Sequence, residues 1–396
     1  MEKKCENTAY KAFEEYFSNV EDPRQPSKVK HLLEEVLFIT VLAVISGCDD
    51  FNEIAEYAHY KQAWLKTFLK LPGGTPTHDT FNRVLCLINP AQFRNSFIGW
   101  IDHIRNGLRL SAGEIAGGEQ HPGEVICIDG KTVCGSKDRH ADKKPIHMVS
   151  AYASEQELVL GQLKCYEKSN EITAIPELLD MLDIEGAIIT IDAMGCQKKI
   201  AETILNKKAD YILAVKDNQG NLHKEITDMF SKADTPAFSH YLHECDTWVE
   251  KDHGRVETRE CKLIRNLGWL YEIQSWKGVE CILKITSSVL RDGKTIGEER
   301  FYISSIQELT ANAANRAVRK HWHIENKLHW VLDMVFKEDY ARARTENAAE
   351  NLTTIRKIAL NAMKLEKSDK CSLKIKRKKA GWDDSYALKI LLNIKM

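Results

Sequence analysis

Two aspartates follow short apolar runs that are typical of buried strands. Asp129 comes directly after Val-Ile-Cys-Ile, and Asp192 directly after Ile-Ile-Thr-Ile. A carboxylate at the end of a central strand loses solvation, which raises its pKa unless a cation compensates. Either acid alone could simply begin a turn, since Asp is a common turn residue. Two such acids on different strands of one sheet indicate like charges that need a counter-ion, and a divalent metal is the usual one.

Magnesium suits such a site. Mg²⁺ prefers oxygen ligands and keeps several waters, so two or three carboxylates are enough to hold it. Two metal ions about 4 Å apart can activate a nucleophile on one side of a phosphate and stabilise the leaving oxygen on the other. We therefore expect two Mg²⁺ ions, with Mn²⁺ as a substitute. This chemistry calls for a third acid.

The segment HWHIENKLHW, residues 321–330, holds one acid, Glu325, at its centre. If the segment is a helix, one of its faces is an apolar stripe, and Glu325 and His329 lie in the adjacent row. If that stripe packs on the sheet, Glu325 reaches the strand ends that carry Asp129 and Asp192. The stripe consists of Ile324, Leu328, Val331 and Val335.

The histidines and tryptophans of the same segment allow other interpretations. A zinc site is disfavoured because His321 and His323 point to different faces of a helix, and no H-E-x-x-H spacing or C-x-x-C pair exists. A purely structural aromatic helix with a surface glutamate remains the plain alternative. Trp330 is expected to pack against the core, whereas Trp322 could pack or stack on DNA.

Basic side chains before and after these acids indicate a polyanionic substrate. A basic rim around an acidic centre suits a polyanion whose scissile phosphate meets the metals. For any single cation, a solvated surface charge is the alternative. The rim residues singled out as DNA contacts are Lys131, Lys216, Arg319 and Arg342.

The elements that must position these residues begin after a helical region. Residues 1–110 show apolar side chains at helical spacing. The stretch GGTPTHDTFNRVL places Thr77 as an N-cap before a helix, which could belong to a small bundle or to a helix-turn-helix. Residues 111–123 are rich in Gly and polar residues and predict a linker.

Residues 125–220 predict the order β-β-β-α-β-α-β. Three closely spaced strands followed by α/β crossovers favour a mixed sheet flanked by helices. Strand-like pieces separated by polar turns fill residues 240–304, and the helical period returns over residues 307–363. The basic run KIKRKK at 374–379 is expected to be a solvated or disordered tail, with a nucleic-acid contact as the alternative.

Bulk properties limit the class of protein. The 396 residues carry a formal net charge of −1, so a nucleic-acid partner must bind through local patches. The 11 cysteines form no regular framework, which favours a reducing compartment. The strongest apolar run, residues 36–48, is shorter than the roughly 20 residues that span a bilayer. We expect a soluble cytoplasmic protein without a secretory signal.

Several motifs together resemble a known family. They are DGKTV, HMVSAYA, ITIDAMGCQ, YILAVKDNQGNL, DHGRVETRE, FYISSI and RKHWHIENKLHWVLDMVFKEDYARAR, and they occur in this order along nearly the whole chain. The set closely resembles the H-repeat-associated transposases, a branch of the bacterial insertion-sequence DDE transposases.

The resemblance implies a fold, a triad and a reaction. The implied fold is α/β: a ribonuclease-H-like mixed sheet flanked by helices, with a β-rich insertion and an N-terminal helical domain. Asp129, Asp192 and Glu325 become the catalytic acids that bind the metals. At the positions of the family's Tyr, Arg and Lys around the glutamate, this chain has Val318, His321 and Leu332. The phosphate contacts are then expected from His321, Asn326 and His329.

The expected domains follow from the same comparison. Residues 1–110 would be a candidate DNA-binding domain, 124–225 and 306–365 the two parts of the catalytic domain, 226–305 the insertion, and 366–396 a basic tail. The expected function is DNA transposition: water cleaves element ends in double-stranded DNA, and the freed 3′-hydroxyl attacks target DNA. Binding should depend strongly on salt, and by analogy two ends need at least a homodimer, working at the nucleoid.

Three rival functions remain. A nuclease of the same fold would cut but not join DNA. A catalytically inactive DNA-binding descendant would bind without cutting, although the intact acids count against it. A metal-dependent hydrolase of small phosphoesters would show no DNA affinity.

Overall fold

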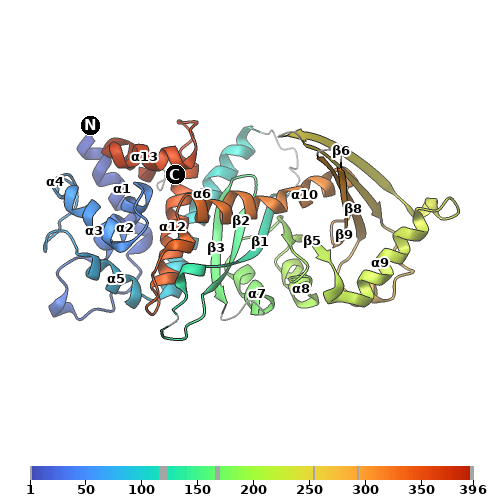
Figure 1. Ribbon diagram of the computed structural model, residues 1–396, viewed down its shortest axis with the longest axis horizontal. Helices are drawn as coiled ribbons and strands as arrows, with labels where there is room; N and C mark the ends of the chain where they lie inside the picture. Colours follow the sequence, from blue (N-terminus) through green and yellow to red (C-terminus); the bar gives the residue numbers. More distant parts are fainter. Residues whose placement is uncertain are drawn as a thin grey trace.

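A computed structural model describes residues 2–115, 123–138, 140–165, 170–252, 255–291 and 294–392. Helices from both ends of the sequence gather at one end of the molecule, a sheet occupies the middle, and its longest strands form the other end (Figure 1). None of the helices in these ranges combines the length and the apolarity needed to cross a bilayer.

The first region is helical, as expected. Its helices are α1 (Glu2–Phe17), α2 (Leu33–Ile45), α3 (Phe51–Tyr60), α4 (Gln62–Leu65), α5 (His78–Leu87) and α6 (Pro90–Ile115). Helix α2 is buried on nearly every side, which explains the uninterrupted apolar run in its sequence. Thr77 has the extended backbone of an N-cap to α5.

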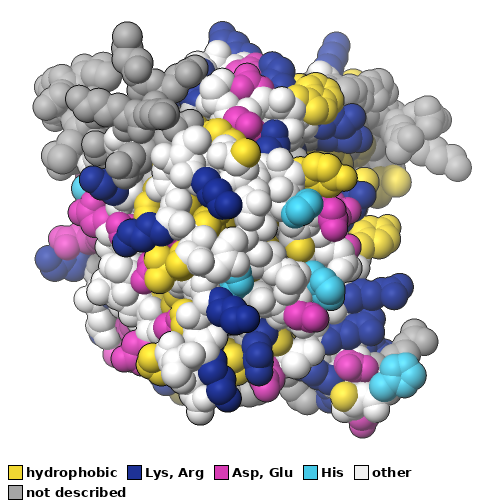
Figure 2. All heavy atoms as spheres, turned by 90° about the vertical axis from the view of Figure 1, so that its left-hand side faces the viewer, with side chains coloured by type: hydrophobic (Ala, Val, Ile, Leu, Met, Phe, Trp, Pro, Cys, Tyr) yellow, Lys and Arg dark blue, Asp and Glu magenta, His cyan; other side chains and the backbone are white. Residues whose placement is uncertain are grey.

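Two findings qualify the predictions for this region. Because α6 continues to Ile115, the predicted linker at 111–123 begins inside a helix, and its residues 116–122 lie outside the described residues. On the face of the molecule at the helical end, Lys and Arg side chains are interspersed with acidic and apolar side chains and form no continuous basic patch (Figure 2).

The predicted strand and helix order over residues 125–220 is confirmed. The elements are β1 (Val125–Thr132), β2 (His147–Ala153), β3 (Leu158–Cys165), α7 (Glu171–Met181), β4 (Ile188–Ile191), α8 (Lys198–Asn206) and β5 (Asp210–Val215). Strand β1 pairs antiparallel with β2 and parallel with β4, and β4 pairs parallel with β5. The sheet is therefore mixed, and β1 lies at the change from antiparallel to parallel pairing.

The strand-rich segment extends this same sheet. After α9 (Gly220–Ala233) come β6 (Glu244–Asp252), β7 (Arg255–Ile264), β8 (Cys281–Arg291) and β9 (Lys294–Ser304). Strand β9 pairs antiparallel with β5, which gives one sheet of order β3-β2-β1-β4-β5-β9-β8-β7-β6. Helix α9 was not predicted, and the expected boundary at 225/226 falls inside it.

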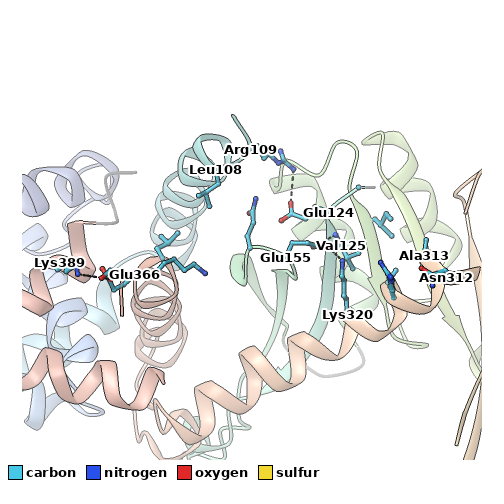
Figure 3. Close-up of a pocket in the computed structure, with 18 residues that line it drawn as sticks. Leu108, Arg109, Glu124, Val125, Glu155, Asn312, Ala313, Lys320, Glu366 and Lys389 are labelled. Carbon is cyan, nitrogen blue, oxygen red and sulfur yellow. Dashed lines mark hydrogen bonds and ion pairs between the residues drawn. The ribbon is translucent and has the colours of Figure 1, made fainter. Parts of the chain in front are cut away.

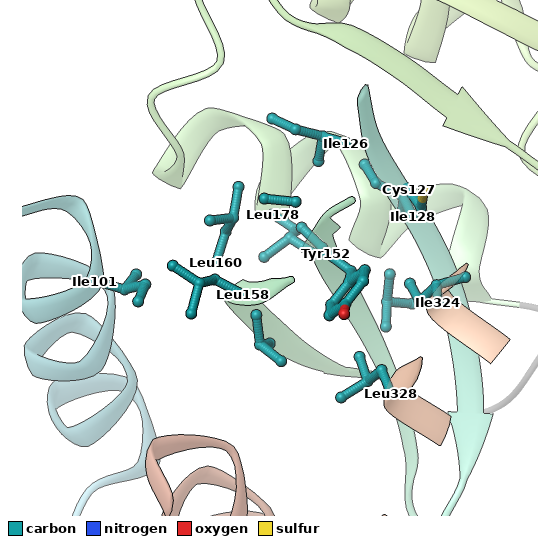
Figure 4. Close-up of a cluster of buried hydrophobic side chains, with 14 of the residues drawn as sticks. Ile101, Ile126, Cys127, Ile128, Tyr152, Leu158, Leu160, Leu178, Ile324 and Leu328 are labelled. Carbon is teal, nitrogen blue, oxygen red and sulfur yellow. The ribbon is translucent and has the colours of Figure 1, made fainter. Parts of the chain in front are cut away.

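A long interrupted helix crosses this sheet. It comprises α10 (Ala311–His323), the π-helical segment η7 (Ile324–His329) and α11 (Trp330–Met334). Ile324 and Leu328 are fully buried and lie beside Tyr152 of β2 (Figure 4). The predicted apolar stripe is therefore confirmed, and it fastens the helix to the sheet. Helix α12 (Ala348–Leu365) follows and packs on α2, α5, α6 and β3.

The prediction of a disordered basic tail at 374–379 was wrong, and the alternative of a solvated tail holds for only part of the run, since Lys374 and Lys378 are exposed. Helices α13 (Leu373–Trp382) and α14 (Asp384–Leu392) fold back on the N-terminal helices. Lys376 and Arg377 are buried. Arg377 donates to the Val44 carbonyl at 3.0 Å and pairs with Asp49 at 2.9 Å. These cations satisfy carbonyl oxygens at the end of a buried helix, so part of the charge run is structural.

Candidate active site

The sheet register brings Asp129 and Asp192 together. Ile128 of β1 is paired with Ile191 of β4, so the next residues on these parallel strands are the two aspartates. Asp192 follows the last residue of β4, as predicted. Asp129 does not end its strand: β1 continues to Thr132 because β2 pairs with it beyond the end of β4.

Both aspartates point toward the long helix. Successive side chains of a strand alternate between the two faces, so Asp129 shares a face with Cys127. The Cys127 Sγ lies 3.3 Å from the Lys320 carbonyl of α10, which places this face beneath that helix. Thr190, on the Asp192 side of β4, is hydrogen-bonded at 3.0 Å to His321 of α10.

Glu325 lies on the π-helical segment directly after α10 and is exposed to solvent. Burial raises the pKa of Asp129 to about 7, with the Gly130 amide opposing the shift and the charges of Asp192, Glu171 and Glu325 adding to it. The acids are therefore close enough to repel one another. π-Helical turns are rare and are often found at functional sites.

A cavity of about 220 Å³ opens between Asp192 and Glu325. Asp192, Glu325, Lys216 and His321 all line it, together with Trp322. The guanidinium of Arg300 lies 5.1 Å from the Trp322 ring centroid, which indicates a cation–π contact. Trp322 is therefore a wall of the site, whereas Trp330 is 56% exposed, so the prediction that Trp330 packs in the core was wrong. Trp330 does not belong to the apolar stripe that packs on the sheet, which explains its exposure.

The donor set fits a hard divalent cation better than zinc. The three acids offer only carboxylate oxygens, and Asp192 Oδ1 is oriented by the amides of Met194 at 3.0 Å and Gly195 at 3.2 Å. His323 is held elsewhere, with Nδ1 2.6 Å from Ser154 Oγ, so the histidines do not converge. Among the described residues, no three acidic, histidine or cysteine side chains are already gathered at metal-binding distance.

The two histidines predicted to contact phosphate, His321 and His329, are partly buried. Burial lowers the pKa of His321 to about 4 and that of His329 to about 3. His329 Nδ1 lies 3.5 Å from Asp129 Oδ2. Both rings are neutral at neutral pH, so neither supplies positive charge to a phosphate.

The other predicted DNA contacts fall into two groups. Lys216, Asn326 and Arg342 are exposed, and of these only Lys216 lines the cavity beside Asp192 and Glu325. Arg319 points toward Glu250 of β6 at 3.5 Å and Glu257 of β7 at 3.9 Å. Lys131 is largely buried among carboxylates.

Two buried polar groups near Asp129 were not predicted. Lys357 of α12 donates to Ser150 at 2.9 Å, and Ser150 is the β2 residue opposite Asp129. His147 and Glu171 lie 2.5 Å apart and are both buried on the other face of β1. The signal in the sequence was a lysine inside the continuous apolar pattern of α12, since a buried cation needs specific partners.

A larger cavity, about 1040 Å³, lies away from the acids. It touches Val125 and Ile188, the first residues of β1 and β4, so it opens at the opposite end of these strands. Its charges are largely paired: Arg109 lies 3.6 Å from Glu124, and Lys389 lies 3.6 Å from Glu366 (Figure 3). It is not part of the candidate active site.

Comparison with known proteins identifies the class. The family model described as "Transposase DDE domain" matches residues 120–362, and the model "DDE_Tnp_1-associated" matches residues 14–101. The chain belongs to the DDE transposase family. This confirms the resemblance drawn from the motifs.

Relatives match over almost the whole chain. "Putative transposase YncI" of Escherichia coli O157:H7 is 42% identical over 95% of this chain and 93% of its own length. "H repeat-associated putative transposase YhhI" of Escherichia coli K12 is 40% identical over 95% and 97%. A solved piggyBac transposase synaptic complex with hairpin DNA covers 94% of this chain and 78% of its own, with 11% identity and a TM-score of 0.41. That likeness is too weak to support a conclusion about function.

Proposed function

We propose that this protein is an active DNA transposase that cleaves the ends of an insertion element and joins them to target DNA. The observation that carries the proposal is that Asp129 and Asp192 follow paired residues of two adjacent strands, and that Asp192 and Glu325 line one cavity. Among the described residues, no lysine or arginine forms an ion pair with any of these three acids. A cluster of negative charge that the chain leaves unbalanced favours binding of cations.

Each acid has a proposed role. Asp129 and Asp192, on adjacent strands, would hold the metals, and Glu325, on the helix across the sheet, would complete the second site. Two Mg²⁺ ions, once bound, would supply the positive charge that favours attack on a phosphodiester and stabilises the leaving oxygen. The proposed catalytic domain is the ribonuclease-H-like part of the sheet, β1–β5, with α10 and η7 across it.

The proposed reaction has two steps. Water attacks the phosphodiester at an element end, which breaks the P–O3′ bond and frees a 3′-hydroxyl. That hydroxyl then attacks a phosphodiester of the target, forming one bond and breaking another without net hydrolysis. Lys216 is the proposed phosphate contact closest to the acids, because it is exposed and lines the same cavity. Asn326 and Arg342 are the other exposed candidates, and synapsis of two ends would require at least two protomers.

Cleavage and joining of end DNA test this proposal. Double-stranded DNA taken from the sequence flanking the coding region would be incubated with Mg²⁺ and an unrelated target plasmid. We expect nicks at the element boundary and products joined to the plasmid. Cleavage without joining would favour the nuclease. Binding without cleavage would favour the inactive descendant, a fate already named for one short relative, "Inactive transposase YbfQ", which aligns with 18% of this chain.

A further inference from the structure

Lys131 lies two residues after Asp129 on the same face of β1 and is surrounded by acids. Its Nζ is 2.8 Å from Asp333 Oδ1, 3.1 Å from Asp339 Oδ1 and 3.3 Å from Glu338 Oε2. The side chain is 10% exposed. We propose that Lys131 is a positioning residue that ties the strand carrying Asp129 to the helix carrying Glu325. The proposal rests on the proposed function, since it concerns the spacing of these two acids.

The three acids come from the chain that follows Glu325. Asp333 belongs to α11, directly after the π-helical segment, and Glu338 and Asp339 belong to the short helix η8 (Glu338–Tyr340). Through Asp333, Lys131 therefore fixes the end of the helix that presents Glu325. Through Glu338 and Asp339, it fixes the turn in which that helix ends.

A second set of contacts holds the turn at residues 338–341 against the loop that follows β1. Asp339 Oδ1 accepts a hydrogen bond from the Cys134 amide at 2.9 Å. A Cβ added to Gly135 would lie 2.3 Å from the Ala341 carbonyl oxygen, so the two backbones are in direct contact. Glu338 is 1% exposed and lies 4.0 Å from the buried Arg356. Strand β1 and the end of the Glu325 helix thus move together.

The helix that presents Glu325 departs from regular α-helical geometry. Residues 324–329 form a π-helical segment, which is rare and often occurs at functional sites. A catalytic site needs its groups fixed within about half an ångström of the productive geometry. The ion cluster around Lys131 supplies a fixed point between the strand and the helix.

A role of Lys131 in DNA binding is the competing interpretation. Three carboxylates lie within 3.3 Å of this ammonium group, which donates a hydrogen bond to Asp339, so its charge is already balanced inside the protein. Lys216 offers the contrast, because it is exposed and lines the cavity beside Asp192 and Glu325. These two lysines make a matched pair of variants.

The test compares Lys131→Met with Lys216→Met in three measurements on the full chain. The rate of amide hydrogen exchange in residues 330–341 measures how firmly the end of the helix is held to β1. Titration with Mn²⁺, followed by electron paramagnetic resonance, measures the affinity of the metal site. The salt dependence of DNA binding without metal measures the number of phosphate contacts. For Lys131→Met we expect exchange faster by roughly tenfold, Mn²⁺ affinity lower by roughly tenfold, and an unchanged salt slope. For Lys216→Met we expect a salt slope smaller by about one and unchanged exchange.

The outcomes separate the two proposals. A smaller salt slope with unchanged exchange in Lys131→Met overturns the positioning role. If Lys131→Met does not fold, Asp333→Asn removes one contact alone, and unchanged exchange there overturns the role equally. Lys131→Arg should restore exchange and Mn²⁺ affinity in large part. If the wild-type protein binds no Mn²⁺ and cleaves no DNA, the proposed function fails, and the exchange measurement still decides whether the tie exists.

Discussion

Two groups of three carboxylates lie within the same part of this protein, and they differ in what balances their charge. The first group is Asp129, Asp192 and Glu325. The second group is Asp333, Glu338 and Asp339, which surrounds Lys131 and approaches Arg356. Among the described residues, neither lysine nor arginine forms an ion pair with the first group, and the nearby His329 is neutral at neutral pH.

The difference shows how one residue type takes two roles. Where the chain supplies its own cation, acids serve as joints between elements that are distant in sequence. In the first group, which has no such cation among the described residues, burial and to a lesser extent the neighbouring carboxylates raise the pKa of Asp129 to about 7, so an external cation would stabilise this site. The comparison therefore predicts that the first group governs activity and the second governs stability.

Glu325→Gln should have the largest effect, and on activity alone. Because Glu325 is exposed and forms no ion pair with a described residue, the substitution should leave the free energy of unfolding within about 0.5 kcal/mol of wild type. Cleavage of end DNA should fall by roughly a thousandfold or more, since one of the proposed metal carboxylates is lost. Cleavage at the wild-type rate would remove Glu325 from the catalytic group.

Glu338→Gln should show the opposite pattern. This buried acid lies between Lys131 and Arg356, so its loss leaves buried positive charge without compensation. We expect the free energy of unfolding in urea to fall by roughly 3–5 kcal/mol. Cleavage should fall far less than in Glu325→Gln once folded protein is compared at equal concentration. Unaltered stability would mean that the second group is not a structural joint.

Asp129→Asn should stabilise the metal-free protein at high pH. The folded pKa of about 7 lies above the ordinary value of 3.8, so above pH 7 the folded state carries the full penalty of the charged form. Between pH 7 and pH 4 the folded protein takes up the proton and the penalty fades. We expect the variant to be more stable by roughly 2–4 kcal/mol at pH 8, and by little at pH 4.

Urea unfolding in a chelating buffer at pH 8, 6 and 4.5 measures this effect. Asp333→Asn is the control, because Lys131 then loses a partner and stability should fall at pH 8. Saturating Mg²⁺ should cancel the advantage of Asp129→Asn by stabilising the wild-type protein alone. A variant less stable than wild type at pH 8 would show that Asp129 is not under electrostatic strain.

The sequence predicted the parts that depend on local pattern. Apolar runs identified β1 and β4, their spacing gave the order of strands and helices over residues 125–220, and the stripe through Ile324 and Leu328 identified the buried side of the helix. These features predicted that Asp129, Asp192 and Glu325 lie close together. They are short apolar runs and a period of 3.6 residues, which short windows of sequence contain.

The parts that depend on distant partners could not be predicted in the same way. Lys131 was predicted to contact DNA because of its positive charge. Its actual partners, Asp333 and Asp339, lie about 200 residues further along the chain, where a local pattern cannot reveal them. Strand β1 continues beyond Asp129 because β2 pairs with it there. The apolar run that predicted the strand ends at Asp129, so it could not reveal this continuation. His321 and His329 were expected near phosphate, yet both lie on the side of the long helix that faces the sheet, where burial lowers their pKa values and keeps them neutral.

Asp192→Asn and Asp339→Asn test the comparison at the smallest expected change in stability, because both acids accept hydrogen bonds from backbone amides. Asp192 accepts the amides of Met194 and Gly195, and Asp339 accepts the amide of Cys134. An asparagine oxygen can accept the same bonds, so each substitution should lower the free energy of unfolding by only about 1 kcal/mol. Cleavage should be abolished in Asp192→Asn and should persist in Asp339→Asn. Because both variants should keep nearly the stability of the wild type, unfolding could not explain a loss of cleavage. If both variants lost cleavage equally, the two groups of acids would therefore act as one site.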